Sequence, residues 1–419
     1  MQIRHRQTLL HEWHISHGAK MSVFGGYDMP LWYASALKEH LAVITHAGLF
    51  DTGHMASVMV TGADAFALLQ HCFTNDLTQC VGKEKKPLFP GRCVYGAFLD
   101  ENGHVIDDAI VFMMEKEEYM VVINAGMGAT IAAHLSAHSN RWNVQITDLT
   151  DQLGKMDIQG PVSAKILGKL VADPENVFVH LPYFSFKGHF DETSPLSSQV
   201  RLKDGTAIVL SRTGYTGEFG FEIFLAPAHF VRVWELLMKT GEEYGLIACG
   251  LAARDSLRAG AVLPLSHQDI GHWPFINHPW PFALPFTKNG KNFSKAFIGS
   301  QALLKAEHAE YTYPFVGDDL RKVTLPAIVA DREGKEIGTV LTCATDMAIG
   351  WHKGKIFSIA TPDKPEDFSP KGLSCGFVKV KKELSPGEAV ELGDARRKIT
   401  VRIVEDIRPD RTARMKIKI

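Results

Sequence analysis

The segment Glu101–Phe112 reads ENGHVIDDAIVF and joins a turn to a strand. Its Asn-Gly pair is a typical hairpin turn, and an apolar run closes the segment. Asp107 and Asp108 lie between the two, and adjacent side chains of a strand point to opposite faces. One acid is expected to face solvent or a backbone partner, and the other to be driven inward. A buried carboxylate is costly unless it is paired or used, so the inward acid is a candidate for chemistry. The plainer alternative is a pair of turn and strand-edge acids.

The strand that carries these acids has strand-like neighbours on both sides. Residues Cys93–Leu99, Val105–Phe112 and Glu118–Asn124 predict three strands separated by turns. Further strands are expected over Ala56–Thr61, Trp142–Asp148, Lys155–Gln159, Phe184–His189, Gln199–Arg212 and Gly220–Leu225. Helices are expected over Thr8–His17, Ala34–Ala47, Ala65–Cys72 (with Asp64 as its cap), Ala125–Ala137, Pro161–Leu170 and Ala228–Thr240. Strands and helices mingle without the regular alternation of a doubly wound sheet, which indicates an antiparallel α+β fold.

The C-terminal third has a different pattern. A mixed segment follows Pro285, and the stretch from Thr324 to Ile407 contains many short strands broken by Gly and Pro. Such spacing is typical of a separate β-barrel or sandwich. With 419 residues, the chain is long enough for two to four domains.

Composition excludes several functional classes. Hydrophobic residues make up 45% of the chain and charged residues 22%, which is ordinary for a soluble globular protein. The 45 basic residues nearly balance the 47 acidic ones, so no field exists to attract nucleic acid. We therefore expect no nucleic-acid partner.

Location and redox state follow from the apolar and cysteine patterns. The N-terminal stretch lacks the apolar core of a signal peptide, and no stretch approaches the roughly eighteen apolar residues that span a bilayer. A cytoplasmic protein with no membrane association is expected. The six cysteines form no C-x-x-C pair and are expected to be reduced thiols.

A glycine-rich segment, Ser211–Phe224, reads SRTGYTGEFGFEIF. A phosphate-binding loop needs a helix directly after its glycines, whereas a strand pattern follows here, so a tight glycine hairpin is the better interpretation. Tyr215 and Glu222 keep a functional interpretation. An aromatic ring and a carboxylate are what a pterin needs, the first for stacking and the second for its amino and N–H groups.

Two groups of histidines suggest a metal site. One is His11, His14 and His17 on one helical face, and the other gathers His267, Asp269, His272 and His278. Neither has the context of a known metal motif, so we expect solvated or stacked histidines and no metal. Ser266 before His267 lacks a nucleophile elbow. Arg254 and Asp255 alone suggest an exposed helix pair.

Six ordered motifs give a more specific indication. They read VFGGYDMPLWY, AGLFDTGHM, INAG, IQGP, SRTGYTGEFGFEIF and AARDSLR, and they begin at Val23, Ala47, Ile123, Ile158, Ser211 and Ala252. Together they closely resemble the aminomethyltransferase family, which comprises the T-protein of the glycine cleavage system and related folate-dependent demethylases. The resemblance runs from about the tenth residue to about Leu304 and continues more weakly to the C-terminus.

The resemblance implies a three-domain cloverleaf around a central folate channel. Residues 1–56 and 150–283 would form a discontinuous folate-binding α+β domain, 57–149 an inserted α+β domain, and 284–419 a C-terminal β-barrel domain. Tetrahydrofolate would be the cofactor.

By matched motif, the resemblance also assigns roles to residues. Asp108 corresponds to the catalytic aspartate of the family. The folate-site positions correspond to Tyr95, Asn124, Tyr215, Glu222, Arg254 and, across a gap in the match, Arg411.

The function implied is transfer of a one-carbon unit from an aminomethyl donor to tetrahydrofolate, with release of ammonia. Its partner would be a lipoyl-carrier protein resembling the H-protein. Two alternatives stay open: a tetrahydrofolate-dependent demethylase of a small N-, O- or S-methyl compound, and a non-catalytic folate-binding assembly factor.

Departures from the family pattern concern the donor side. His272–Phe286 reads HWPFINHPWPFALPF where the family has a glycine-rich segment, and about twenty extra residues lie near Trp351–Lys371. Pro274, Phe275, Pro279, Trp280, Pro281 and Phe282 are expected to form a stiff aromatic wall at a donor entrance, or else a packed inter-domain loop.

Overall fold

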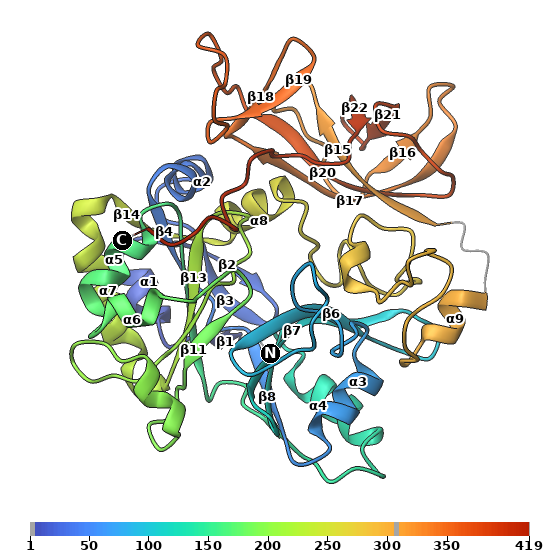
Figure 1. Ribbon diagram of the computed structural model, residues 1–419. Coiled ribbons are helices and arrows are strands. Elements are labelled where there is room, and N and C mark those ends of the chain that lie inside the picture. Colours follow the sequence, from blue (N-terminus) through green and yellow to red (C-terminus); the bar gives the residue numbers. More distant parts are fainter. Residues whose placement is uncertain (1–4, 306–309, 419) are drawn as a thin grey trace.

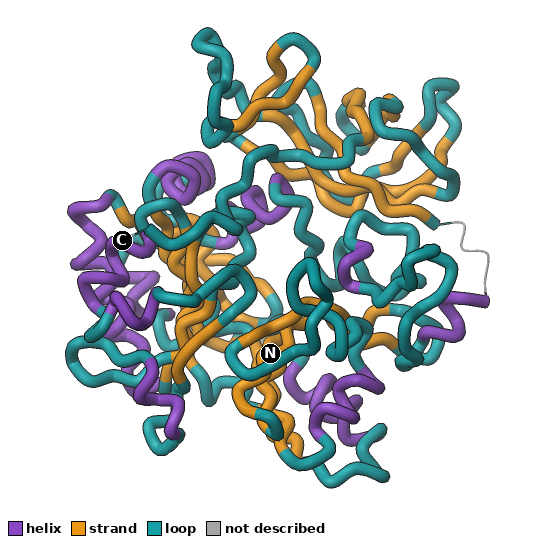
Figure 2. The backbone as a smooth tube through the Cα atoms, in the orientation of Figure 1, coloured by secondary structure: helices purple, strands orange, loops and turns teal. Residues whose placement is uncertain are grey.

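The computed structural model describes residues 5–305 and 310–418, which form three lobes around a common centre (Figure 1). Two lobes are sheets covered by helices, and the third consists almost entirely of strands and loops (Figure 2). Mixed helices and strands with a C-terminal barrel confirm the α+β fold class. Among the described residues, no helix combines the length and the apolar character needed to cross a membrane.

The first lobe contains a six-stranded sheet built from distant parts of the chain. Its order is β11 (Phe186–Gly188), β12 (Val209–Ser211), β13 (Gly220–Leu225), β10 (Gly154–Gln159), β4 (Ala47–Asp51) and β14 (Leu246–Cys249). The pairs are antiparallel except for β4 with β14. A small sheet of β1 (Arg6–Gln7), β3 (Tyr27–Trp32) and β2 (Lys20–Phe24) accompanies it.

Helices lie on both faces of this six-stranded sheet. The helices of the lobe are α1 (His11–Ser16), α2 (Ala36–Thr45), α5 (Ser163–Leu170), α6 (Pro174–Phe178), α7 (Phe230–Gly241) and α8 (Leu251–Gly260), with short 3-10 helices at Pro195–Gln199, Pro227–His229 and Glu242–Tyr244. Met156 and Ile158 of β10 join the core formed with α5 and α7. Strand alternation therefore turns Lys155 and Asp157, the alternate residues of this strand, to the opposite face, toward the centre of the molecule.

The second lobe is a five-stranded antiparallel sheet in the order β6 (Arg92–Leu99), β7 (Val105–Glu115), β8 (Glu118–Ile123), β5 (Ala56–Thr61) and β9 (Gln145–Asp148). Helices α3 (Ala65–Cys72) and α4 (Gly128–Ala137) pack on it. Figure 1 shows this lobe at the lower right.

The third lobe is a closed barrel in the order β15 (Tyr311–Gly317), β20 (Leu373–Val380), β17 (Glu336–Asp346), β16 (Ile328–Ala330), β21 (Ala389–Gly393) and β22 (Lys398–Ile403). Closure pairs every strand edge, and it decides between the barrel and sandwich that the sequence left open. The 3-10 helix Pro281–Ala283 and α9 (Ser300–Lys305) precede the barrel. The extra segment near Trp351 contributes the hairpin β18 (Ile349–His352) and β19 (Lys355–Ser358).

We propose the domain bounds stated above, 1–56 with 150–283, 57–149 and 284–419, on the basis of these three sheets. Strand β4 precedes the second lobe in the sequence, whereas its partners β10 and β14 both follow that lobe. A discontinuous first domain accounts for this pairing.

Several local predictions are wrong. Of the strand expected over Gln199–Arg212, only β12 forms, and Gln199 is instead the last residue of a 3-10 helix. Asp64 does precede α3, but its carboxylate accepts from the backbone N–H of Asn143 instead of capping the helix. The predicted helix over Ala34–Ala47 ends at Thr45, and strand β4 begins at Ala47.

A buried arginine ties the barrel and the C-terminal tail to the first lobe. Arg408 donates to the carboxylates of Asp346, on β17, and Glu218, in the loop before β13. Asp346 also lies 3.1 Å from His40 Nε2 of α2. Although burial raises the pKa of Asp346, the charges and hydrogen bonds of Arg408 and His40 hold it below its usual range. The carboxylate is therefore ionised and paired at neutral pH.

Replacing Arg408 by Met should destabilise the protein strongly, because two buried carboxylates would lose their compensating charge. The expected loss is about 3–5 kcal/mol in the free energy of unfolding, measured by urea denaturation. The matched control is Arg402→Met, since Arg402 is exposed and lies 3.7 Å from exposed Asp318; its expected cost is below about 1 kcal/mol. Equal losses in the two variants would contradict this account of the buried arginine.

Candidate functional site

A cavity of about 1450 Å³ lies where the three lobes meet. Its walls include residues of β2, β7, β8, α8, β17 and the tail that follows β22. The structure brings all seven site residues expected from the sequence to this cavity: Tyr95, Asp108, Asn124, Tyr215, Glu222, Arg254 and Arg411.

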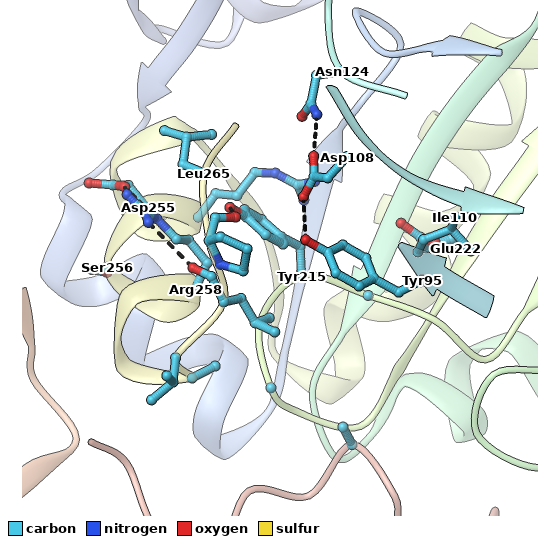
Figure 3. Close-up of a pocket in the computed structure, with 18 of the residues that line it drawn as sticks. Tyr95, Asp108, Ile110, Asn124, Tyr215, Glu222, Asp255, Ser256, Arg258 and Leu265 are labelled. Atoms are coloured by element: carbon cyan, nitrogen blue, oxygen red, sulfur yellow. Dashed lines mark hydrogen bonds and ion pairs between the residues drawn. The ribbon is translucent and has the colours of Figure 1, made fainter. Parts of the chain in front are cut away.

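Strand register brings Tyr95 and Asp108 together. In the β6–β7 pair, Ala97 lies opposite Asp108 and Tyr95 opposite Ile110, so Tyr95 and Asp108 are diagonal neighbours on one face. The Tyr95 hydroxyl donates to Asp108 Oδ2 at 2.8 Å (Figure 3). The side chains of Asp108 and Ile110 both line the cavity.

Asp107 points away from Asp108, as alternation requires, but it is the more deeply buried of the two acids. It accepts from the backbone N–H of Asn124 at 2.9 Å and from the Ser266 hydroxyl at 2.7 Å. The Asn124 side-chain amide donates to both acids, at 2.8 Å to Asp107 and 2.6 Å to Asp108. As expected, one acid, Asp107, meets a backbone partner while the other, Asp108, faces the cavity; Asp107 is buried as well, because the lobes enclose both faces of the strand.

Enclosure changes the acidity of both acids. Burial raises the pKa of Asp107 and of Asp108 above the usual range. The neighbouring charge of Asp107 raises the pKa of Asp108 further, while hydrogen bonds from Tyr95 and Asn124 act in the opposite sense. A carboxyl with a raised pKa that faces a cavity is suited to exchange protons near neutrality.

Glu222 belongs to a charged network that sequence reasoning missed. Lys155 Nζ donates to Glu222 and to Asp157, at 2.6 Å each, and the Thr213 hydroxyl donates to the other Glu222 oxygen. Residues 155 and 222 are far apart in the sequence, and only the β10–β13 pairing brings them together. Because a carboxylate offers about four lone-pair positions, Glu222 retains acceptor capacity toward the cavity.

Arg254 is held on the cavity side of α8. Its guanidinium donates to Asp157 Oδ2 at 2.8 Å and lies 4.9 Å from the centre of the Tyr215 ring. The Tyr215 hydroxyl donates to the Pro264 carbonyl. The interpretation of Arg254 as part of an exposed helix pair is wrong; it is Asp255 that pairs on α8, with Arg258 (Figure 3).

Arg411 reaches the cavity from the C-terminal tail. Its guanidinium donates to the Asp406 carboxylate and to the Arg408 carbonyl. Gly217 has a φ of +75°, and a Cβ there would lie 2.7 Å from Arg411 Cδ. Glycine at this turn therefore permits the close approach of the tail.

His54 is a further residue of the cavity wall that sequence reasoning overlooked. It is buried, its Nδ1 has no hydrogen-bond partner, and its ring lies against Phe24 and Tyr27. Burial lowers its pKa to about 4, so the imidazole is neutral. The sequence feature that could have identified His54 as a site residue is its place in the AGLFDTGHM motif.

Three of the histidines considered above as metal ligands contact other protein groups. His14 Nε2 lies 2.9 Å from Asp51 Oδ2 and its Nδ1 2.8 Å from the Tyr33 hydroxyl. His17 stacks on Trp13, and His278 on Phe275.

The aromatic segment after His272 divides between two roles. Trp280 is 1% exposed, packs in the core between the second lobe and the barrel, and donates from Nε1 to the Val262 carbonyl at 2.8 Å. Pro279 and Phe282 line the cavity, and Phe282 is 57% exposed. The prediction of a donor-side wall is wrong for Trp280, which belongs to a packed inter-domain loop.

A solved protein shares this architecture over its whole length. The crystal structure of glycine cleavage system aminomethyltransferase T from Bartonella henselae superposes with a TM-score of 0.76 and 26% identity, covering 99% of this chain and 100% of that one. The fold is that of the T-protein class of transferases.

Sequence comparisons agree with the structural one. The family model described as the GCVT N-terminal domain matches residues 10–273. The aminomethyltransferase of Bacillus pumilus (strain SAFR-032) is 38% identical over 341 residues, 80% of this chain and 86% of the relative. That of Alkaliphilus metalliredigens (strain QYMF) is 33% identical over 341 residues, 80% and 85% of the two chains. The chain belongs to the aminomethyltransferase family, and it is a T-protein-like transferase.

The two roles of the aromatic segment predict losses of very different size on substitution by alanine. Trp280→Ala should cost about 3–5 kcal/mol of stability in urea denaturation, because it opens a void between two lobes. Phe282→Ala should cost less than about 1 kcal/mol, since its ring is largely exposed. A larger loss for Phe282→Ala would show that the segment is packed differently.

Proposed function

We propose that this chain transfers a one-carbon unit from an aminomethyl donor to tetrahydrofolate, producing methylene-tetrahydrofolate and ammonia. Aminomethyltransferases are folate-dependent in general. The observation that carries the proposal is Asp108, an acid with a raised pKa held at the cavity wall by Tyr95 and Asn124.

The cavity residues fit a reduced folate. A pterin has a flat ring bordered by amino and N–H groups, for which Tyr215 offers an aromatic face and Glu222 a carboxylate. The unpartnered Nδ1 of His54 offers a further polar contact in the same wall. Folate ends in carboxylates, and Arg254 and Arg411 bring positive charge to the cavity. We propose these residues as the folate-binding set, with Tyr95 and Asn124.

Tetrahydrofolate would supply the nitrogen that receives the one-carbon unit. Asp108 would accept the proton which that nitrogen loses, and its charge would stabilise positive charge that develops on the carbon. Tyr95 and Asn124 fix the carboxylate in place, so no side-chain reorganisation is needed. The lobes that enclose the cavity limit water, which would otherwise compete for the one-carbon unit.

For the donor, we propose an aminomethylated lipoyl carrier. Proteins of the T-protein class work with the H-protein of the glycine cleavage system. Phe282, exposed beside the cavity, offers an apolar contact for the arm of such a carrier.

The donor is tested by supplying tetrahydrofolate together with either aminomethylated lipoyl carrier or small methylated amines, ethers and thioethers. We expect ammonia and methylene-tetrahydrofolate from the carrier at about 1–10³ s⁻¹. Turnover with free methylated compounds alone would replace this proposal by the demethylase. Folate binding with no turnover on either donor would favour the non-catalytic assembly factor.

Asp108→Asn should lower the turnover number by at least ~10²-fold, because the amide cannot accept a proton. Folate affinity, measured by calorimetry, should change little, since the amide keeps the shape of the side chain. Asp255→Asn serves as a matched control, because Asp255 also lines the cavity but pairs with Arg258, and it should leave turnover nearly unchanged. Equal losses in both variants would remove Asp108 from the catalytic role.

Asp107→Asn should move the pH dependence of turnover. The charge of Asp107 raises the pKa of Asp108, so its removal lowers that pKa. If Asp108 acts as the ionised base, activity rises with pH through this pKa, and the acidic limb of the pH–rate profile should shift to lower pH. An unchanged limb, or a shift to higher pH, would contradict the coupling of the two acids.

A further inference from the structure

A cysteine and two histidines converge in the second lobe, away from the cavity. Cys72 ends α3, His134 lies in the last turn of α4, and His138 follows that helix directly. Sγ of Cys72 and one ring nitrogen of each histidine all lie within 4.8 Å of one another. None of the three lines the central cavity. The folate chemistry proposed above therefore does not explain the cluster.

Helix geometry aims the two histidines at the same place. Residues four apart lie on the same helical face, so His134 and His138 are neighbours, and their ring centres are 4.8 Å apart. Cys72 completes the group from a second helix and is fully buried. The three side chains thus bridge α3 and α4.

One ring nitrogen of each histidine is available to bind a ligand. His138 Nδ1 lies 2.8 Å from the His134 carbonyl, which can only accept, so Nδ1 carries the proton and Nε2 keeps its lone pair. Metal-bound histidines are typically oriented in this way, by a second nitrogen that donates to a carbonyl. His134 Nε2 is buried and has no hydrogen-bond partner. A buried nitrogen of this kind is costly unless something binds it.

We propose that Cys72, His134 and His138 bind a zinc ion. A thiolate with two imidazoles is a soft nitrogen–sulfur set that Zn²⁺ prefers, with bonds of about 2.0–2.3 Å. The three ligand atoms already lie within 4.8 Å of one another, and small side-chain rotations would bring them to one ion. Glu101, whose Oε1 lies 3.9 Å from His138 Nε2, or a water would take the fourth position.

A cation lies beside the cluster. Lys295 Nζ donates to the Gln70 and Phe73 carbonyls, at the end of α3 beside Cys72. Burial raises the pKa of the Cys72 thiol and the charge of Lys295 acts in the opposite sense, so the thiol gives up its proton when the metal binds. The expectation of no metal site rested on other histidines, and this proposal departs from it.

The test is a titration of the reduced, chelator-treated full chain with Co²⁺ and then Zn²⁺, followed by absorption spectroscopy. We expect one equivalent of Co²⁺ to produce a thiolate-to-cobalt charge-transfer band and the visible bands of tetrahedral coordination, and Zn²⁺ to displace it. The absence of these bands in the wild-type protein would overturn the proposal by itself.

Variants locate the site. Cys72→Ser should abolish the charge-transfer band, whereas Cys80→Ser, which changes a half-buried thiol of the same lobe outside the cluster, should keep it. His138→Asn can preserve the donor to the His134 carbonyl but removes Nε2, and should weaken zinc binding by at least ~10-fold. Unchanged zinc affinity in Cys72→Ser would place the metal elsewhere, for example at Asp100, His104 and His272, and would overturn the proposal.

Zinc should raise the thermal midpoint of the wild-type protein but not that of Cys72→Ser, since an ion that binds only the folded state stabilises it. None of these zinc measurements uses folate turnover. The metal proposal and the proposed function therefore fail separately.

Discussion

The arrangement of the lobes depends on the buried guanidinium of Arg408. It pairs with Asp346 of the barrel and with Glu218 of the first lobe, and it accompanies a tail that carries Arg411 to the cavity. A buried ion pair adds little net stability, because desolvation offsets the attraction between the charges. It does require a defined geometry, because a buried charge without its partner is strongly destabilising. The central cavity is the space that remains when these partners are in place.

Alternation within strands determines which charges face that space. On β10, Met156 and Ile158 enter the helix-covered core, so Lys155 and Asp157 turn to the other face and meet Glu222 and Arg254. On β7, Asp108 turns to the cavity while Asp107 turns to Asn124 and Ser266. Both acids are enclosed, and their mutual repulsion raises the pKa of the one that faces the cavity. The position of Asp108 on β7 therefore accounts both for its place at the cavity and for its raised pKa.

Local pattern predicted much of this, and long-range packing accounts for the rest. The three strands around Asp107 and the short strands of the barrel follow from turns and alternation, which are local. The site residues that converge on the cavity were anticipated through family motifs. The pairing of Lys155 with Glu222 depends on strand order, and the burial of Trp280 depends on contact between two lobes, so neither has a local signal. The same holds for Arg408, which resembles its neighbour Arg411 in sequence but differs in its partners.

The measurement that tests the account most directly is a crystal structure of the protein with tetrahydrofolate. The account predicts the pterin in the central cavity, beside the ring of Tyr215, with a folate nitrogen within hydrogen-bonding distance of the Asp108 carboxylate. Folate bound outside the cavity, or in it with Asp108 directed away from the ligand, would contradict the account.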